Sequence, residues 1–193
     1  IDVEDTGTSP LTSDTDNDGL EDDEEILCRL YTPSGGKFCS HPLDSDSDND
    51  GITDGDEYYI YSTNPIDNDE DNDGLFDGLE IGISLNNIWE DIEHNLVPCK
   101  TKTGGTMTNC QETWQPDEND LSTTDPRNED SDGDGLLDGD EDTNANGILD
   151  ESETAADLFD TDGGGRSDYE EIFTDSTDPR DPDDDVNDWD GDG

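Results

Sequence analysis

The sequence predicts a mostly irregular, extended chain of tandem repeats in place of a compact domain with one large core. The first observation is composition: Asp+Glu number 59 against Lys+Arg 7, the formal charge is -52, and 25% of residues are hydrophobic. Such a chain buries too little apolar surface to offset the conformational entropy lost on folding. The second observation is a twelve-residue acidic pattern that recurs along the chain, the signature of a repeat architecture.

The clearest copy of the pattern is 130–141, which reads DSDGDGLLDGDE. Acidic residues stand at positions 1, 3, 5, 9 and 12, glycine at position 6 and an apolar residue at position 7. Ca²⁺ takes about six to eight oxygen ligands, and this spacing supplies them from side chains, from the position-7 carbonyl and from a bidentate Glu at position 12. The spacing therefore predicts an EF-hand-like calcium loop.

The pattern occurs in six copies, and four of them, 14–25, 46–57, 69–80 and 130–141, keep every position. Loop 142–153 is softened by two uncharged Asn oxygen donors, and loop 160–171 has glycine at position 5 and arginine at position 7. We expect loop 160–171 to be the weakest complete site, or to recruit water or a neighbouring carboxylate. The predicted ligands are Asp14, Asp16, Asp18, Leu20, Asp22, Glu25; Asp46, Asp48, Asp50, Ile52, Asp54, Glu57; Asp69, Asp71, Asp73, Leu75, Asp77, Glu80; Asp130, Asp132, Asp134, Leu136, Asp138, Glu141; Asp142, Asn144, Asn146, Ile148, Asp150, Glu153; and Asp160, Asp162, Arg166, Asp168, Glu171.

About six or more Ca²⁺ ions are therefore expected, and six would bring the formal charge from -52 to -40. Metal binding would then be part of the folding free energy. The alternative for an acidic run is a solvated or disordered tail. The fixed placement of glycine and the apolar residue in the first four loops favours metal sites over that alternative.

A second periodicity surrounds the loops. The motif [ST]-x-Pro, as in Thr63-Asn64-Pro65, places a proline four residues before the first ligand of each of the four complete loops, and a fifth copy begins at Thr177. Proline fixes φ and pushes its predecessor towards extended geometry, which suits a chain entering the next site. Short apolar pieces follow the loops, so we expect a helix of one or two turns with position 12 in its first turn, packed from repeat to repeat.

With these motifs, the units resemble bacterial thrombospondin type 3 repeats, whose form is close to DTDGDGLSDGEE preceded by T-[ND]-P. The resemblance covers most of the chain outside two insertions. It implies an extracellular, calcium-loaded, stalk-like region of a surface or adhesive protein. Asn144, Asn146, Gly164 and Arg166 depart from the family pattern, which bears on the occupancy of the last two loops.

The insertions carry the cysteines and set the expected organisation of the chain. Residues 1–80 hold three loops and the pair Cys28 and Cys39, 81–121 hold an insert with Cys99 and Cys110, and 122–193 hold the remaining loops. Both pairs enclose Gly-Gly, so pairing within each hairpin or omega-like loop is the simplest of the three connectivities. Disulfides indicate an oxidising compartment. A zinc site with nearby histidines is the alternative, but its cysteines normally stand closer together.

The 81–121 insert is the least acidic part of the chain. Apolar residues from Leu85 to Leu96 recur at spacings of three and four, which predicts a helix. Its apolar stripe either packs against the Cys99–Cys110 loop in a small core or forms a docking face for a partner. At the other end, Asp188, Asp190 and Asp192 occupy positions 1, 3 and 5 of a half-loop. We expect this unit to continue head to tail, within a longer protein or across a subunit boundary.

The function expected from these features is structural: a rigid extracellular stalk, spacer or filament building block at a cell surface. The alternative is a calcium-dependent adhesion or docking module that binds another surface protein or a glycan. No nucleophile with a base, phosphate loop or zinc-hydrolase motif is present, so we expect no enzyme activity. The net charge disfavours binding to nucleic acid. We expect no membrane span, and we expect the chain to be a mature or excised piece of a protein. One methionine disfavours a calcium sensor.

Overall fold

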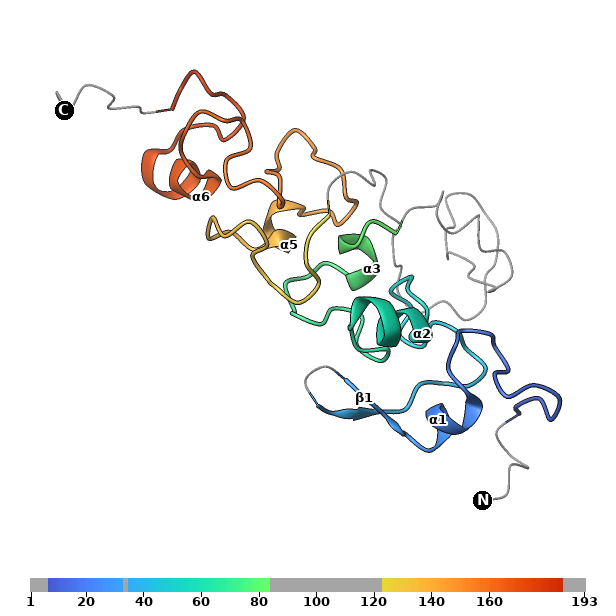
Figure 1. Ribbon diagram of the computed structural model, residues 1–193. Helices are drawn as coiled ribbons and strands as arrows, with labels where there is room; N and C mark the ends of the chain where they lie inside the picture. The colour runs from blue at the N-terminus through green and yellow to red at the C-terminus, as the bar shows by residue number, and fades with distance from the viewer. Residues whose placement is uncertain (1–6, 33–34, 84–122, 186–193) are drawn as a thin grey trace, which may run out of the picture.

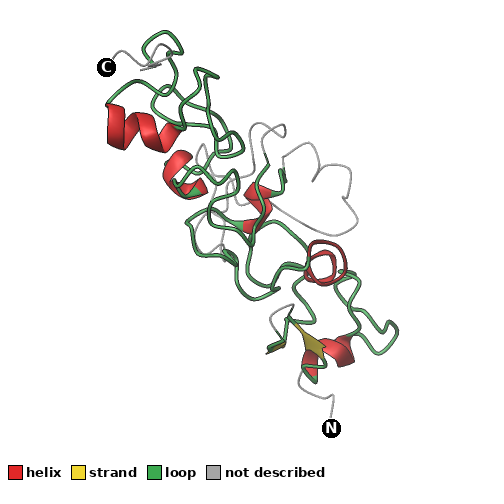
Figure 2. Ribbon diagram, turned by 60° about the vertical axis from the view of Figure 1, so that its left-hand side comes forward, coloured by secondary structure: helices red, strands yellow, loops and turns green. Residues whose placement is uncertain are grey.

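The computed structural model describes residues 7–32, 35–83 and 123–185. These residues form an elongated succession of loops, from the blue N-terminal segments at one end of Figure 1 to the red C-terminal ones at the other. Most of the described chain is irregular, with short helices between loops and one small sheet (Figure 2). The repeats therefore follow one another in sequence order, apart from one loop described below.

Every α-helix of the described chain begins at the position-9 aspartate of a loop. The residue before it has an extended backbone, and Thr53 and Ser167 accept a hydrogen bond there from a backbone N–H of the first turn. The partial positive charge of a helix N-terminus favours the acidic residues of that turn. The helices are α1 Asp22–Ile26, α2 Asp54–Asp56, α3 Asp77–Glu80, α5 Asp138–Glu141 and α6 Asp168–Glu170, and the last turn widens into η1 Glu57–Tyr61 after α2 and η3 Glu171–Asp175 after α6.

Two backbone positions of each loop are left-handed. Position 6 is glycine throughout, with φ of 101° at Gly19 and 111° at Gly74, values that side-chain-bearing residues rarely adopt. Position 4 is also left-handed, and Asn17, Asn49 and Asn72 tolerate it with φ of 63°, 65° and 65°. The sequence pattern predicts the left-handed backbone at position 6 but gives no indication of the one at position 4.

The apolar residue at position 7 supplies the core of each complete loop. Leu20 is 0% exposed, Ile52 2%, Leu75 4% and Leu136 9%. Burial of one such side chain contributes about 1.5–3 kcal/mol. The core is therefore divided among the loops, with a few apolar residues at each.

The largest apolar cluster joins the first two repeats. Leu20, Leu30 and Phe38 form it, and Tyr58, which follows the second loop, packs against it with its ring centroid 5.9 Å from that of Phe38. The expected packing of post-loop residues from repeat to repeat is right for Tyr58. It is wrong for the next residues of η1, which are mostly exposed, because a single short helical turn can present only one side to the cluster.

The first insertion is a hairpin closed by a disulfide. Strands β1 Leu30–Tyr31 and β2 Lys37–Phe38 pair antiparallel, with Leu30 opposite Phe38 and Tyr31 opposite Lys37. Cys28 and Cys39 are bonded directly beyond the strands, with their Cα atoms 4.5 Å apart. The predicted pairing of these two cysteines is confirmed.

Three predictions fall outside the described residues: the helix over 85–96, the Cys99–Cys110 bond and the terminal half-loop at 188–192. Among the helices that the structure describes, none has the length and apolar character needed to cross a bilayer.

Candidate metal centres

The first three acidic positions of each complete loop in the N-terminal half converge on one point. One carboxylate oxygen from each of Asp14, Asp16 and Asp18 lies within 4.8 Å of the others. The corresponding residues of the next two loops, at 46, 48 and 50 and at 69, 71 and 73, form the same arrangement. Three like charges at such separations repel one another unless a cation lies between them.

The structure orients these carboxylates by local hydrogen bonds. The position-1 carboxylate accepts from backbone N–H groups of its own turn, as Asp14 Oδ1 does from Asn17 at 2.7 Å. One oxygen at position 5 accepts the N–H of position 7, as Asp18 does from Leu20 at 2.7 Å. The second oxygen of Asp14 accepts the Gly19 N–H at 3.2 Å, whereas the second oxygen of Asp18 is left without a donor.

Other carboxylate oxygens are also buried without donors. In the described chain, twenty buried carboxylate oxygens have no hydrogen-bond partner. Burial of an ionised group that lacks a partner is costly, so native structures rarely retain it. These atoms belong to Asp16 (both), Asp18, Glu25, Asp46, Asp48, Asp50, Glu57, Asp69, Glu70, Asp71, Asp77, Glu80, Asp132, Asp138, Glu141, Asp162, Glu171 and Asp185 (both).

The position-12 glutamate is held the same way in five loops. One of its oxygens accepts a Ser or Thr hydroxyl from the segment that leads into the following loop, and the other oxygen has no donor. The O···O distances are 3.1 Å for Ser40 to Glu25, 3.2 Å for Thr63 to Glu57, 3.0 Å for Thr124 to Glu80, 2.9 Å for Thr154 to Glu141 and 3.3 Å for Thr177 to Glu171.

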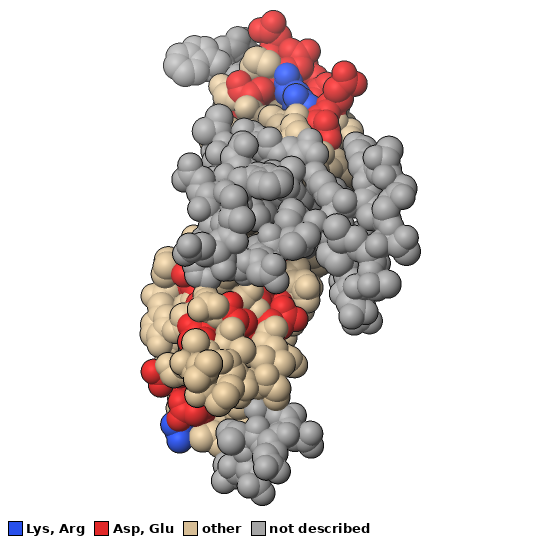
Figure 3. All heavy atoms as spheres, turned by 90° about the vertical axis from the view of Figure 1, so that its right-hand side faces the viewer, with Lys and Arg blue, Asp and Glu red and all other residues tan. Residues whose placement is uncertain are grey.

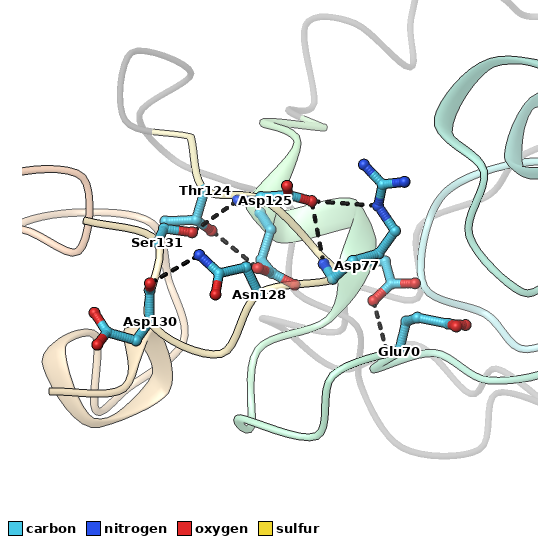
Figure 4. Close-up of polar contacts among 9 residues, drawn as sticks. Glu70, Asp77, Thr124, Asp125, Asn128, Asp130 and Ser131 are labelled. Atoms are coloured by element: carbon cyan, nitrogen blue, oxygen red, sulfur yellow. Dashed lines mark hydrogen bonds and ion pairs between the residues drawn. The ribbon is translucent and has the colours of Figure 1, made fainter. Parts of the chain in front are cut away.

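This contact explains the [ST]-x-Pro periodicity. Four of the five hydroxyls belong to that motif, so the motif positions a donor on the preceding loop as well as the chain entering the next one. The Thr124 hydroxyl reaches Glu80 although 44 positions separate them in sequence. Figure 4 shows this lead-in beside the third loop, with Ser131 bonded to Asp125 and Asp77 to Glu70.

A second set of acidic groups combines residues of two consecutive loops. Oxygens of Asp18 and Glu25, at positions 5 and 12 of the first loop, lie within 4.8 Å of Asp54, which is position 9 of the second. Asp50, Glu57 and Asp77 repeat this triad between the second and third loops. All six side chains are buried. Position 9 therefore also approaches the ligand positions of the preceding loop.

Position 9 is oriented by position 2 of its own loop. Asp54 accepts the backbone N–H of Ser47 at 2.8 Å and the Ser47 hydroxyl at 2.6 Å. Asp77 accepts only the N–H of Glu70, at 2.9 Å, because position 2 of that loop has no hydroxyl (Figure 4). The second oxygen of Asp77 is correspondingly without a donor.

The same contacts show which loops are neighbours. Asp73 Oδ2 accepts the Gly139 N–H at 3.1 Å, which joins the third loop to loop 130–141. Asp134 Oδ2 accepts the Tyr169 N–H at 2.7 Å, which joins loop 130–141 to loop 160–171. Thr154 also bonds to Glu141. Loop 142–153 is therefore a side insertion between two loops that contact each other directly.

In loop 142–153, carboxylates accept hydrogen bonds from side chains of the same loop. The Asn144 amide nitrogen donates to Asp150 and to Glu153, both at 2.9 Å, and the Asn146 amide nitrogen donates to Asp150 at 3.2 Å. None of the donor-free buried oxygens of the described chain belongs to this loop. Its geometry thus requires a cation least, whereas loop 160–171 retains donor-free oxygens on Asp162 and Glu171.

Burial and mutual repulsion shift the acidic pKa values upward. Burial, followed by the charges of Asp50 and Asp48, raises the pKa of Glu57 to about 12. Burial, followed by Asp71 and Asp73, raises the pKa of Glu80 to about 10. These shifts belong to the metal-free chain, in which the charged form lacks a counter-charge. A cation at the same point would reverse them.

The charged side chains elsewhere on the surface are also mostly acidic. On the face drawn in Figure 3, red Asp and Glu side chains exceed blue Lys and Arg side chains among the residues that the structure describes. The described ion pairs are few and local, such as Arg127 with Asp125 at 3.3 Å. Basic side chains therefore do not neutralise the buried acidic groups.

Comparison of the chain with protein-family models, with curated protein sequences and with solved structures gave no match.

Proposed function

We propose that this chain is an extracellular calcium-binding repeat protein that acts as a rigid stalk, spacer or filament building block. Calcium ions within and between the loops would hold consecutive repeats in a fixed arrangement. The Cys28–Cys39 disulfide supports an oxidising compartment outside the cytosol. We assign it no catalytic role, because its buried acidic groups are accounted for by ligand geometry.

The observation that carries the proposal is the convergence of buried carboxylates from consecutive loops. Asp18, Glu25 and Asp54 are 6%, 0% and 0% exposed, and oxygens on Asp18 and Glu25 have no donor. Without a cation, folding would bring three negative charges out of water and together. With one, the same groups become the link between two repeats, so ion binding and stacking stabilise each other.

The donor set favours Ca²⁺ among biological cations. All the converging groups are carboxylates, which are hard oxygen ligands, and Zn²⁺ sites would normally include Cys or His. Both cysteines in the described part are bonded to each other. Calcium also tolerates irregular geometry and higher coordination numbers, whereas Mg²⁺ demands an octahedron and retains several waters.

The arrangement of contacts favours a structural role. The described loops contact mainly their neighbours, as in other quasi-linear repeat proteins. Force along the molecule would therefore pass through the shared acidic groups. The stiffness of the molecule would then depend on how many of these sites hold calcium.

A charge-matched pair of variants tests the proposal. Asp54→Asn removes one charge from the shared triad, and Asp56→Asn removes one from an exposed residue of the same helix. We expect Asp54→Asn to lower the bound calcium, measured by elemental analysis after equilibrium dialysis, and to lower the calcium-dependent rise in melting temperature. Asp56→Asn should match the parent. Equal behaviour of both variants, or a parent that binds no calcium, would contradict the proposal.

A calcium-dependent docking role is the second candidate, and exposed apolar side chains favour it. Tyr59 and Ile60 on η1 are 60% and 64% exposed, and Phe173 on η3 is 64% exposed. If these residues bind a second copy, sedimentation should show a mass that rises with calcium, and an Ile60→Ser, Phe173→Ser variant should lose that rise. A monomer under all conditions would leave the spacer role as the better explanation.

A further inference from the structure

Loop 160–171 has no carboxylate at position 5, yet an acidic side chain from outside the loop lies at that place. A Cβ atom built on Gly164 would lie 2.0 Å from Asp185 Oδ2, 2.6 Å from Asp185 Cγ and 3.0 Å from Asp162 Oδ1. The Asp185 carboxylate thus occupies the space in which a position-5 side chain would begin. Glycine leaves that space open.

The oxygens that meet there have no donors. Both oxygens of Asp185, Asp162 Oδ2 and Glu171 Oε2 are buried atoms without a hydrogen-bond partner. Glu171 is 0% exposed, and its other oxygen accepts the Thr177 hydroxyl at 3.3 Å. Glu171 lies within hydrogen-bonding reach of the Asp185 carboxylate, and the charge of Asp162 also acts on it. A fully buried carboxylate with a donor-free oxygen therefore meets two further carboxylates, an arrangement that requires a positive charge.

The arginine of this loop does not provide that charge. Arg166 Nη2 lies 2.6 Å from Asp175 Oδ2, and its Nε donates to the same oxygen at 2.8 Å. Its Nη1 lies 3.3 Å from Glu170 Oε2. The guanidinium is thus paired with two acidic residues outside the ligand positions, and the donor-free oxygens remain without a partner.

The segment that leads out of the loop places Asp185. The Thr177 N–H donates to the Glu171 carbonyl at 3.1 Å, which fixes the start of the segment. The Asp178 N–H donates to the Asp184 carboxylate at 3.1 Å, and the Asp184 N–H donates to the Asp181 carbonyl at 3.0 Å. These turns fold residues 177–185 back over the loop, so Asp185 arrives from the chain beyond it.

We propose that Asp185 is the missing position-5 ligand and completes a calcium site with Asp160, Asp162 and Glu171. The inference rests on the proposed calcium function and extends it to a residue outside every loop motif. Calcium would tie the 177–185 segment to the last loop. This site would then be a full-strength site and no longer the weakest of the set.

The test follows individual loops by the amide resonances of their glycines during a calcium titration of the full chain. The Gly165 N–H donates to Asp160 Oδ2 at 2.9 Å and reports on this loop, and the Gly51 N–H donates to Asp46 Oδ2 at 3.1 Å and reports on loop 46–57. Asp185→Asn should raise the calcium concentration at the Gly165 midpoint by about tenfold or more, because ligand charge tunes affinity over decades. The Gly51 midpoint should stay unchanged.

Two further variants complete the design. Asp183→Asn removes the same charge from an exposed residue two positions away and should leave the Gly165 midpoint within about twofold of the parent. Gly164 does not have a left-handed φ, so Gly164→Asp can restore a ligand within the loop. Combined with Asp185→Ala, which vacates the space that a side chain at position 164 needs, it should recover most of the affinity that is lost without the Asp185 carboxylate.

Each outcome decides between the claims. Equal midpoints for Asp185→Asn and Asp183→Asn would overturn the role of Asp185 and leave the calcium function standing. A Gly51 response without any Gly165 response in the parent would overturn the site itself. If neither resonance responds to calcium, the proposed function and this inference both fail.

Discussion

Replacement of Gly55 by alanine probes the contact between consecutive loops directly. Gly55 is position 10 of loop 46–57 and follows Asp54 of the shared triad in α2. A Cβ atom there would lie 2.0 Å from the Asp18 carbonyl oxygen and 2.9 Å from its carbon. Because these are backbone atoms of the preceding loop, they cannot rotate away. The two loops would have to separate.

Two effects of opposite sign compete in Gly55→Ala. Alanine in a helix is favoured over glycine by about 1 kcal/mol, which alone would stabilise the protein. Overpacking at a close contact costs about 1–3 kcal/mol, and displacement of Asp54 from Asp18 and Glu25 adds the loss of the shared cation site. We therefore expect a net decrease in the free energy of unfolding of about 1–3 kcal/mol in saturating calcium.

Calorimetry at saturating calcium, together with hydrogen exchange of peptides that cover loops 14–25 and 46–57, would measure this change. Exchange should accelerate in both loops, because the contact belongs to both. Asp56→Ala, at an exposed position of the same helix, serves as the control and should change stability by less than about 0.5 kcal/mol. A Gly55→Ala protein that is as stable as the parent, or more stable, would refute the stacked arrangement.

Three other predictions follow from the same contacts. Leu20→Ala should lower stability by about 2–5 kcal/mol in calorimetry, because the side chain is wholly buried against Leu30 and Phe38; an unchanged melting temperature would show that this cluster is not a core. Thr63→Val should cost about 1.5–3 kcal/mol in calcium, because it removes a buried donor to Glu57 at 3.2 Å; a neutral result would show that the hydroxyl does not support the ligand. In the presence of a chelator, the free energy of unfolding should rise as the pH falls from about 8 towards 4, because the raised carboxyl pKa values of Glu25, Asp54 and Glu141 make the folded state take up more protons than the unfolded state. Calcium affinity should fall over the same pH range. A metal-free chain that loses stability on acidification would contradict these pKa shifts.

The ligand positions within a loop could be read from the sequence because they are local. A carboxylate at every second position of a tight turn faces one point, and the glycine at position 6 has the left-handed φ that the pattern implies. The Cys28–Cys39 pair was equally local. In each case the relevant partners lie within about a dozen residues, so chain geometry alone restricts the outcome.

The contacts between loops could not be read from the pattern. The pattern predicts position 9 as a ligand of its own loop. Asp54 and Asp77 do bond to position 2 of that loop, and their oxygens also lie within 4.8 Å of carboxylate oxygens of the preceding loop. Asp185 belongs to no motif, and only the fold brings it to Gly164. Both depend on the path between loops, which the spacing of carboxylates does not encode.

Some of the missed features did leave a signal. The [ST]-x-Pro motif marked the hydroxyls that bond to position 12, but their targets were not identified. Loop 142–153 starts directly after Glu141 without a lead-in, whereas Thr154 stands six residues before Asp160, as Thr63 stands before Asp69. That offset already indicates that loop 160–171 is the true successor of loop 130–141.

The central claim is that calcium holds the repeats in their elongated arrangement, and small-angle X-ray scattering with and without a chelator tests it most directly. For 193 residues, a compact domain would have a radius of gyration of about 16 Å and an unfolded chain about 47 Å. We expect a value between these limits in calcium, with the scattering of a stiff elongated particle, and a clear rise towards the unfolded value in excess EDTA. Identical scattering in both conditions would show that the ions do not hold the fold together.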